Sequence, residues 1–260
     1  GGIPQKTIAA MKECKARGAR TLAVVNVVGS SIAREADHVL YTLAGPEIAV
    51  ATTKAYSAQL SALYAFAVEL ALVKGKLNEE RYGALIGELL SLPEKMELAL
   101  KDKARIQWFA SRHANARDIF FIGRGLDYAI CLEGSLKMKE ISYIHSEAYA
   151  AGELKHGTIS LVEDGTLIVG ALTQRDVLEK TVSNMAECRA RGAYLVSLAG
   201  EGSRKESAFA DFSLFVPETD PHFMGSLAII PLQLLAYYTS VSKGLDVDKP
   251  RNLAKSVTVE

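Results

Sequence analysis

The stretch Met11-Lys-Glu-Cys-Lys-Ala-Arg-Gly-Ala19 recurs as Met185-Ala-Glu-Cys-Arg-Ala-Arg-Gly-Ala193, with seven identities in nine positions at an offset of 174 residues. In both copies, helix-forming residues run into a glycine helix stop and a strand pattern follows. The same offset pairs Ala36-Asp37 with Ala210-Asp211. Because chance would not hold one register over tens of residues, we interpret the chain as two copies of one structural unit.

Strand and helix patterns alternate along both copies. The second copy predicts strands at 119–122, 166–172, 194–198 and 212–215, and helices at 128–144, at 176–191 and up to about 243. The first copy predicts strands at 21–28 and 39–42 and a helix from about 50 to 74. Residues 79–113 predict two connecting helices broken at Ser91-Leu92-Pro93. This alternation indicates an α/β fold of two three-layer α/β/α domains with parallel sheets.

The first of the two expected domains is incomplete. Residue 1 corresponds to residue 175, so the first copy lacks equivalents of about 118–174. A parallel sheet without its opening strands exposes unpaired backbone, so we expect the chain to be an N-terminally truncated piece of a longer protein. The expected division is a partial first domain at 1–75, connecting helices at 76–115, a second domain at 116–245 and a C-terminal segment at 246–260.

Composition narrows the choice of partners. The chain has 260 residues, of which 49% are hydrophobic and 23% charged, and Lys+Arg 30 balances Asp+Glu 30. A net charge near zero provides no field for nucleic acid or anionic membranes, so we expect neither as a partner. The apolar stretch 227–238 contains Pro231 and Gln233 and is too short to cross a bilayer. Three widely spaced cysteines fit reduced thiols in a cytoplasmic protein.

Three charged residues on the helix predicted at 128–144 form what we call the Glu–Lys–Glu stripe: Glu133, Lys137 and Glu140. At about 100° per residue, Lys137 falls near 40° and Glu140 near −20° from Glu133. A solvent-exposed ladder of ion pairs is the alternative, but it requires the polar face of the helix. Instead the stripe lies inside an apolar arc made by Ala129, Ile130, Leu132, Leu136, Ile141, Tyr143 and Ile144. Charges that are costly to desolvate in this way are typical of an acid–base site.

The segment that follows, 145–158, is loop-like and contains His156. A lone histidine is more often structural than catalytic, but this one follows a buried charged stripe and could act as its acid–base partner. His145 would face nearly the same way as the stripe and pack beside it. No pair of histidines has metal-ligand spacing with a third ligand nearby, so we predict no metal, and no motif suggests a cofactor.

Two further segments attract attention. Ala49-Val-Ala-Thr-Thr-Lys-Ala55 places small and hydroxyl residues at the start of a long helix, where free N–H groups favour an anion, although an ordinary Thr cap explains it nearly as well. The C-terminal segment 246–260 carries apolar residues that suggest docking onto the body of the protein. Docking would partly desolvate Lys255 and make its amine available as a nucleophile, whereas a free tail would leave it a solvated lysine.

These segments resemble the isomerase half of the glutamine–fructose-6-phosphate aminotransferase (glucosamine-6-phosphate synthase) family, which is built from two sugar-isomerase (SIS) domains. The matching segments are 47–55, 132–145, 147–157, 231–237 and 246–260. The terminal segment is specific to this family, whereas the SIS fold alone would also fit sugar-phosphate isomerases and sugar-binding regulators.

The resemblance implies a role for each residue chosen above. Lys255 would form a Schiff base with the open-chain ketose, and His156 would assist ring opening. Glu140 would move a proton between C1 and C2, with Lys137 and Glu133 setting its protonation and position. The sugar site would be lined by Val50, Ala51, Thr52 and Ala254.

The resemblance also implies partners and limits. The substrates would be fructose 6-phosphate and glucosamine 6-phosphate, and the protein would be a homodimer in which one subunit's histidine completes its neighbour's pocket. Where the family has a Ser/Gln/Ser/Thr phosphate loop, this chain has Gly1-Gly-Ile-Pro4, and the family's glutaminase domain is absent from it. Two alternatives stay open: a non-catalytic sugar-phosphate-binding regulator, and a deglycase or deaminase acting on an amino-sugar phosphate.

Overall fold

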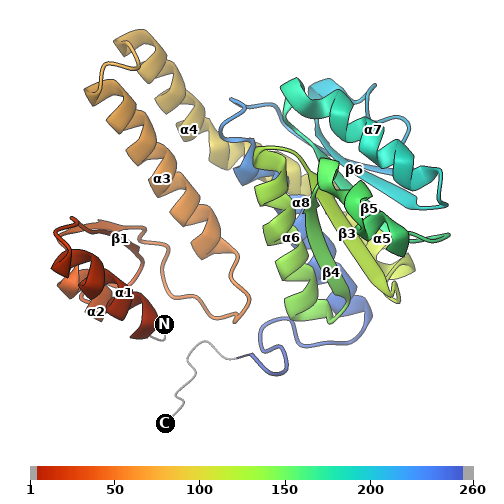
Figure 1. The fold of residues 1–260 in the computed structure, drawn as a ribbon, viewed down its shortest axis with the longest axis horizontal. Helices are drawn as coiled ribbons and strands as arrows, with labels where there is room; N and C mark the ends of the chain where they lie inside the picture. Colours follow the sequence, from red (N-terminus) through yellow and green to blue (C-terminus); the bar gives the residue numbers. More distant parts are fainter. Residues whose placement is uncertain (1–4, 254–260) are drawn as a thin grey trace. The chain divides into compact units, whose positions relative to one another are not determined.

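The computed structural model describes residues 5–253 and contains two compact units (Figure 1). The first unit comprises residues up to 82 together with those from 248 onward, and the second comprises residues 83–247. Both units are built from parallel strands and helices, as the alternating pattern predicts.

The second unit contains a five-stranded parallel sheet in the order β4-β3-β5-β6-β7. The strands are β3 (Asp118–Gly123), β4 (His145–Ala150), β5 (Leu167–Leu172), β6 (Tyr194–Gly200) and β7 (Phe212–Val216). All six residues of the central strand β5 are buried, which is the pattern of a parallel strand covered on both faces.

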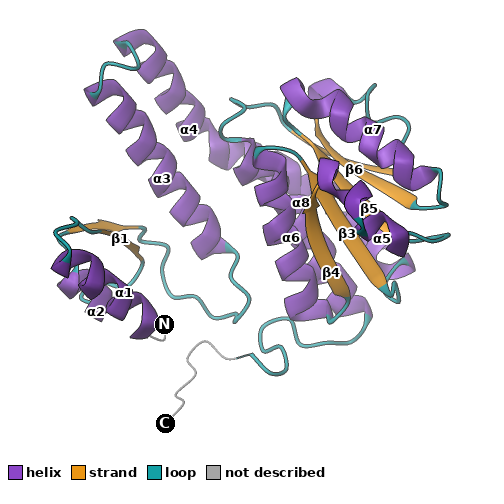
Figure 2. Cartoon of the chain, in the orientation of Figure 1, coloured by secondary structure: helices purple, strands orange, loops and turns teal. Residues whose placement is uncertain are grey.

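Helices cover this sheet on both faces (Figure 2). One group consists of α5 (Lys103–Arg112), α6 (Leu126–Ser142) and α8 (Met224–Ser242), in which α6 and α5 both pack against α8. The other face carries α7 (Leu178–Arg189) and the 3₁₀ turn η2 (Ala151–His156), which contact each other. The remaining short turns are η1 (Leu100–Asp102), η3 (Thr158–Leu161), η4 (Arg175–Val177) and η5 (Glu201–Ser203).

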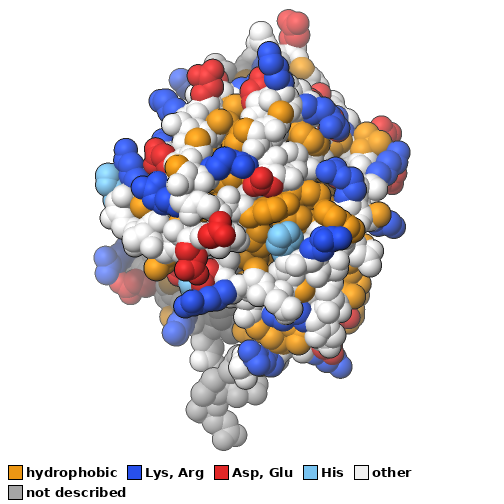
Figure 3. All heavy atoms as spheres, turned by 90° about the vertical axis from the view of Figure 1, so that its right-hand side faces the viewer, with side chains coloured by type: hydrophobic (Ala, Val, Ile, Leu, Met, Phe, Trp, Pro, Cys, Tyr) orange, Lys and Arg blue, Asp and Glu red, His pale blue; other side chains and the backbone are white. Residues whose placement is uncertain are grey.

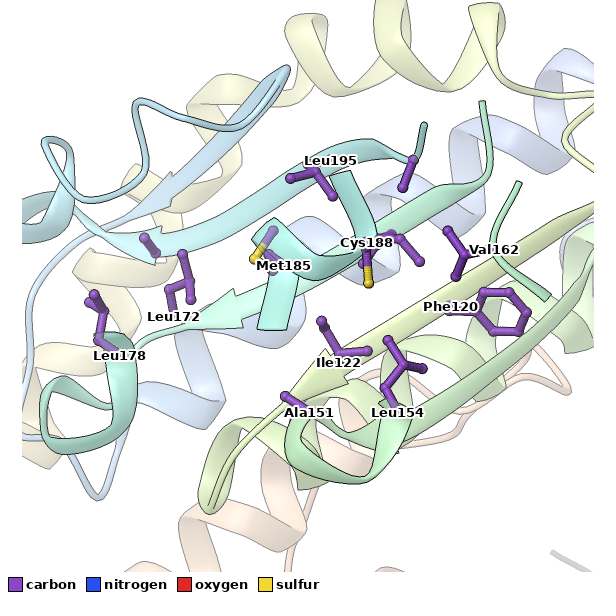
Figure 4. Close-up of a cluster of buried hydrophobic side chains, with 13 residues drawn as sticks. Phe120, Ile122, Ala151, Leu154, Val162, Leu172, Leu178, Met185, Cys188 and Leu195 are labelled. Atoms are coloured by element: carbon purple, nitrogen blue, oxygen red, sulfur yellow. The ribbon is translucent and has the colours of Figure 1, made fainter. Parts of the chain in front are cut away.

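The core between the sheet and α7 is closely packed (Figure 4). Met185 and Cys188 of α7 point toward Leu195 of β6 and Ile122 of β3, and all four side chains are 0% exposed. Gly170 of β5 lies under Met185, whose sulfur leaves no room for a side chain there. This close fit places α7, and the loops that enter and leave it, firmly on the sheet.

The first unit contains α1 (Gln5–Ala16), β1 (Leu22–Val25), α2 (Ser31–Glu35), β2 (His38–Tyr41) and α3 (Lys54–Val73). Its two strands pair in the same register as their repeat counterparts in the second unit. Leu22 pairs with His38, and Val196 pairs with Phe212, each 174 residues further on (22 + 174 = 196; 38 + 174 = 212).

Ion pairs repeat at the same offset. Lys15 lies 3.0 Å from Asp37, and Arg189 lies 3.0 Å from Asp211. Each aspartate also accepts a hydrogen bond from a backbone N–H at the adjacent strand, at 2.9 and 2.7 Å respectively. The described part of the first unit therefore contains counterparts of α7, β6, β7 and α8, while the expected truncation stays a prediction.

Three local expectations were wrong. Residues 145–150 form the edge strand β4 rather than a loop, because an edge strand with polar residues lacks the apolar run that signals a strand. Pro93 lies inside α4 (Glu79–Ala99), since a proline removes one helical hydrogen bond without having to end the helix. The chain leaves α4 at η1 instead. The helix expected from about residue 50 begins at Lys54.

Two helices, α3 and α8, are long and apolar enough to span a bilayer by length and composition. The apolar stretch 227–238 is only part of α8 (Met224–Ser242). In the apolar window of α8, 61% of the residues are buried, as in a core helix, whereas 6% are buried in that of α3. Because α3 is the repeat counterpart of α8, its composition is that of a core helix.

Candidate functional site

The Glu–Lys–Glu stripe lies on α6, which leaves the sheet at the end of β3 and packs along α8. Gly134 permits this packing, because a side chain at that position would come within 2.5 Å of Leu232 of α8. Ser146 of β4 donates a hydrogen bond of 2.7 Å to the Ser135 carbonyl and ties the helix to the edge strand. The backbone that presents the stripe is therefore held on two sides.

The three charged side chains contact one another and are largely buried. The ammonium of Lys137 lies 2.6 Å from Glu140 Oε2 and 3.4 Å from Glu133 Oε1. The exposed fraction is 4% for Lys137, 14% for Glu133 and 22% for Glu140. The stripe is therefore not a surface ladder of ion pairs, although Leu132 and Leu136 of the predicted apolar arc are exposed.

The two carboxylates differ in their surroundings. Burial raises the pKa of Glu133 above its ordinary value, although Lys137 opposes the shift. Glu140 Oε2 is buried and lies 2.6 Å from the Lys137 ammonium, which pairs with it. Glu140 is the more exposed of the two carboxylates, so it is the one that could exchange a proton with a bound molecule.

The last turn of α6, which carries Glu140, is held by a small network. Lys243, at the end of α8, donates a hydrogen bond of 2.7 Å to the Ser142 carbonyl. The Ser142 hydroxyl donates to the Met138 carbonyl at 2.6 Å. Tyr143 then ends the helix in the left-handed conformation (φ 59°), which is costly for a residue with a large side chain. Sequence analysis missed Lys243, although a lysine at this position is typical of a helix C-terminus.

The structure does not bring His156 to the stripe. His156 is exposed at the end of η2, whose Ala151 and Leu154 pack into the core on the α7 side of the sheet (Figure 4). The expectation that His145 packs beside the stripe was wrong. Because His145 begins β4, its ring Nδ1 lies 2.7 Å from Asp118 Oδ1 instead.

The expected sugar-lining residues of the first unit lie before α3, not on it. Val50 and Ala51 lie in a bend, with Thr52 just before Thr53, and Ala51 is 6% exposed. Thr53 caps the helix without a side-chain hydrogen bond, so the ordinary Thr-cap explanation does not hold. The Val50 N–H donates a hydrogen bond of 3.0 Å to the Asp248 carbonyl. The C-terminal segment therefore lies beside this bend.

The predicted nucleophile lies further along that segment. Lys255 and Ala254 are outside the described residues. The segment is described as far as Leu253, which is 43% exposed rather than buried as expected. Among residues 5–253 no cluster of His, Cys, Asp and Glu could hold a metal ion.

Both units are thus built from parallel strands and helices, and one of them buries the Glu–Lys–Glu stripe on a helix. The SIS domain model matches residues 3–69 and 114–243, and the chain belongs to the SIS domain family. Over 259 residues it is 58% identical to the glutamine–fructose-6-phosphate aminotransferase (isomerizing) of Caldanaerobacter subterraneus and 55% identical to that of Clostridium tetani. All of this chain aligns, but it spans only 43% of the length of each relative.

Solved structures agree with the sequence relatives. The C-terminal domain of glucosamine-fructose-6-phosphate aminotransferase from Francisella tularensis is 37% identical, with a TM-score of 0.90 over 94% of this chain and 70% of that one. Glucosamine-6-phosphate deaminase from Thermotoga maritima is 26% identical, with a TM-score of 0.69 over 95% of this chain and 70% of that one. The chain thus corresponds to the C-terminal, isomerase part of the aminotransferases.

Proposed function

We propose that this chain is the isomerase module of a glutamine–fructose-6-phosphate aminotransferase, which converts fructose 6-phosphate and ammonia to glucosamine 6-phosphate. The buried Glu–Lys–Glu stripe carries the proposal, because its energetic cost is intelligible in a proton-transfer site. The high identity to the named aminotransferases supports it. Ammonia would come from a glutaminase domain in the full-length enzyme.

The reaction follows from these groups. The Lys255 amine would add to the C2 carbonyl of the open-chain ketose and release water, which gives an imine. Ammonia would then displace the Lys255 amine from C2 and leave the imine of ammonia. An imine at C2 acidifies the C1 hydrogens, so Glu140 could take a proton from C1 and return it to C2. Lys137 would hold Glu140 in place, and the raised pKa of Glu133 keeps that carboxyl closer to neutral. A positioned acid–base group of this kind is worth on the order of 10² to 10⁴ in rate.

The bend at Val50, Ala51 and Thr52, together with Ala254, would bind the sugar. Its hydrogen bond to Asp248 supports this, because it brings the tail that carries Lys255 toward the bend. The four-part division at 1–75, 76–115, 116–245 and 246–260 follows the same proposal, with the last part as a catalytic tail. A cytoplasmic location fits the reduced cysteines, of which Cys131 and Cys188 are buried.

Borohydride trapping tests the Schiff base. Fructose 6-phosphate and borohydride should give a covalent adduct on Lys255 in the full-length protein, read by peptide mass spectrometry. A protein that isomerises the sugar without such an adduct would defeat the assignment. Glu140→Gln should abolish exchange of the C1 proton with solvent while leaving the adduct, and retained exchange would reject Glu140 as the base.

The Thermotoga structure favours one second candidate, a deaminase that acts on glucosamine 6-phosphate with the same carboxylate. Ammonia release from glucosamine 6-phosphate, faster than its synthesis, would select that function. A non-catalytic regulator has no need of the buried stripe, and sugar binding without C1 exchange would select it.

A further inference from the structure

The five-stranded sheet of the second unit has one topological switch point, at which the connections between strands change from one side of β3 to the other. From β3 the chain passes through α6 to β4 on one side, and from β5 it passes through α7 to β6 on the other. In open parallel sheets, ligands bind in the crevice outside the carboxyl ends of the two strands at this switch point. In this unit that crevice lies between the end of β3 and the end of β5.

A buried carboxylate occupies the crevice. Asp127, in the first turn of α6 after β3, is 1% exposed. Its Oδ2 accepts hydrogen bonds from the backbone N–H of Thr173 at 2.9 Å and of Gln174 at 3.1 Å, and its Oδ1 accepts one from the Thr173 hydroxyl. These residues follow β5 directly, so the carboxylate bridges the two strand ends.

The donors around Asp127 are those that hold an oxyanion. Two consecutive backbone N–H groups and a hydroxyl, just before the short turn that leads into α7, form the kind of concavity that binds phosphate in other proteins. Burial raises the pKa of Asp127 although these hydrogen bonds oppose the shift.

A second carboxylate lies near the end of β6, but it is exposed. Glu218 accepts a hydrogen bond of 2.7 Å from the Gly202 N–H and lies 3.5 Å from Arg175, and its side chain is 44% exposed. A side chain at Gly200 would have to displace the end of the Glu218 side chain. Of these two carboxylates, Asp127 is therefore the buried one.

We infer that Asp127 is an internal anion that fills the ligand crevice of the second unit, so that this unit binds no phosphate there and uses α6 only to present the Glu–Lys–Glu stripe. The carboxylate takes the place that a substrate phosphate would need. That the excluded phosphate would be the substrate's rests on the proposed function. The filling of the crevice rests on the topology and the three hydrogen bonds.

Chemical rescue tests the inference without any enzymatic activity. Asp127→Ala should leave the Thr173 and Gln174 N–H groups without an acceptor and open a space the size of a carboxylate. Sodium formate should then refill it. At about ten times its dissociation constant, formate should raise the folded-to-unfolded ratio of this variant about tenfold, compared with sodium chloride at equal ionic strength.

Asp176→Ala is the matched control. Asp176 lies three residues after Thr173, but it is exposed rather than buried. Formate should stabilise it no more than it stabilises the wild type. Equal responses of the Asp127 and Asp176 variants would overturn the inference.

Amide NMR gives an independent readout. In the wild type, the Thr173 and Gln174 amide signals should not move on titration with inorganic phosphate or fructose 6-phosphate. In Asp127→Ala, or in Asp127→Ser should the alanine variant not fold, formate should move both. Movement in the wild type would show that a ligand displaces Asp127, and silence in the variant would show that the crevice is no anion site. Either result would refute the inference.

Discussion

At the scale of single residues, Lys137 holds the site together because it is the cation between two partly buried carboxylates. Without it, Glu133 and Glu140 would face each other as like charges in a poorly hydrated place. Under the proposed function, Lys137 would therefore have both a structural and a chemical role, and one substitution should reveal both.

Lys137→Met should lower the free energy of unfolding by roughly 2–4 kcal/mol, somewhat less than for a fully buried pair because both carboxylates keep some exposure. C1 proton exchange should fall at least about 10²-fold. Urea unfolding and exchange kinetics measure the two effects. Lys139→Met, on the exposed side of the same turn, should change stability by no more than about 0.5 kcal/mol. Equal effects of the two substitutions would contradict this account of Lys137.

His113 should make the free energy of unfolding depend on pH. Its ring lies 4.3 Å from that of Phe109 and 4.9 Å from that of Tyr194, and its pKa is lowered, first by burial and then by Arg112. Between this lowered pKa and about 6.5, the unfolded chain binds more protons than the folded one. The contribution of neutral His113 is therefore complete above about pH 6.5 and decreases as the pH falls through that window.

His113→Phe should remove this pH dependence of the free energy of unfolding. Urea midpoints measured at several pH values should show that the difference between variant and wild type changes across the window and is constant above it. Contributions from groups that the two proteins share cancel in the difference. A difference independent of pH would show that His113 does not titrate differently on folding.

At the scale of elements, the ends of α6 and α8 are joined. Lys243 closes α8 and donates to the carbonyl of Ser142, the last residue of α6, two residues after Glu140. Lys243 also precedes, in sequence, the segment that carries Lys255. If Glu140 transfers the proton as proposed, Lys243 is therefore placed to act as a positioning residue for α6.

Lys243→Met should loosen the last turn of α6 and cost about 1–2 kcal/mol, because a helix C-terminal carbonyl loses a charged donor. Amide hydrogen exchange should accelerate in residues 141–145, and kcat should fall about tenfold with little change in KM. Lys243→Arg should restore both, and Lys139→Met should change neither. Faster amide exchange with an unchanged kcat would limit Lys243 to a structural role.

At the scale of the whole molecule, the position of His156 bears on whether one active site is built from two subunits. It is exposed and lies on the α7 side of the sheet, whereas the stripe lies on α6. As part of the proposed function, we expect a homodimer in which His156 serves the pocket of the partner subunit.

Mixed dimers test this arrangement. Glu140→Gln and His156→Ala chains should each be inactive alone. Mixed in equal amounts and allowed to exchange, they should recover about one quarter of wild-type activity, because half of the dimers are mixed and each has one intact site. No recovery, with exchange verified by native mass spectrometry, would place His156 and Glu140 of the same chain in one site.

Much of the fold could be predicted because its signals are local. The repeat at an offset of 174 predicted that both units share one structural pattern, and β1 pairs with β2 in the same register as β6 with β7. The periodicity of α6 predicted that Glu133 and Lys137 share one buried stripe, since a helix brings residues three and four apart together wherever it packs.

Only the tertiary structure decided the rest. Asp127 and Thr173 are 46 residues apart, and their contact depends on how β3 and β5 pair. The polar strand β4 and the ion pair of His145 with Asp118 likewise exist only because β4 lies at the edge beside β3. A single sequence encodes periodicity along an element directly, but it encodes contacts between distant elements only through the packing of the whole domain.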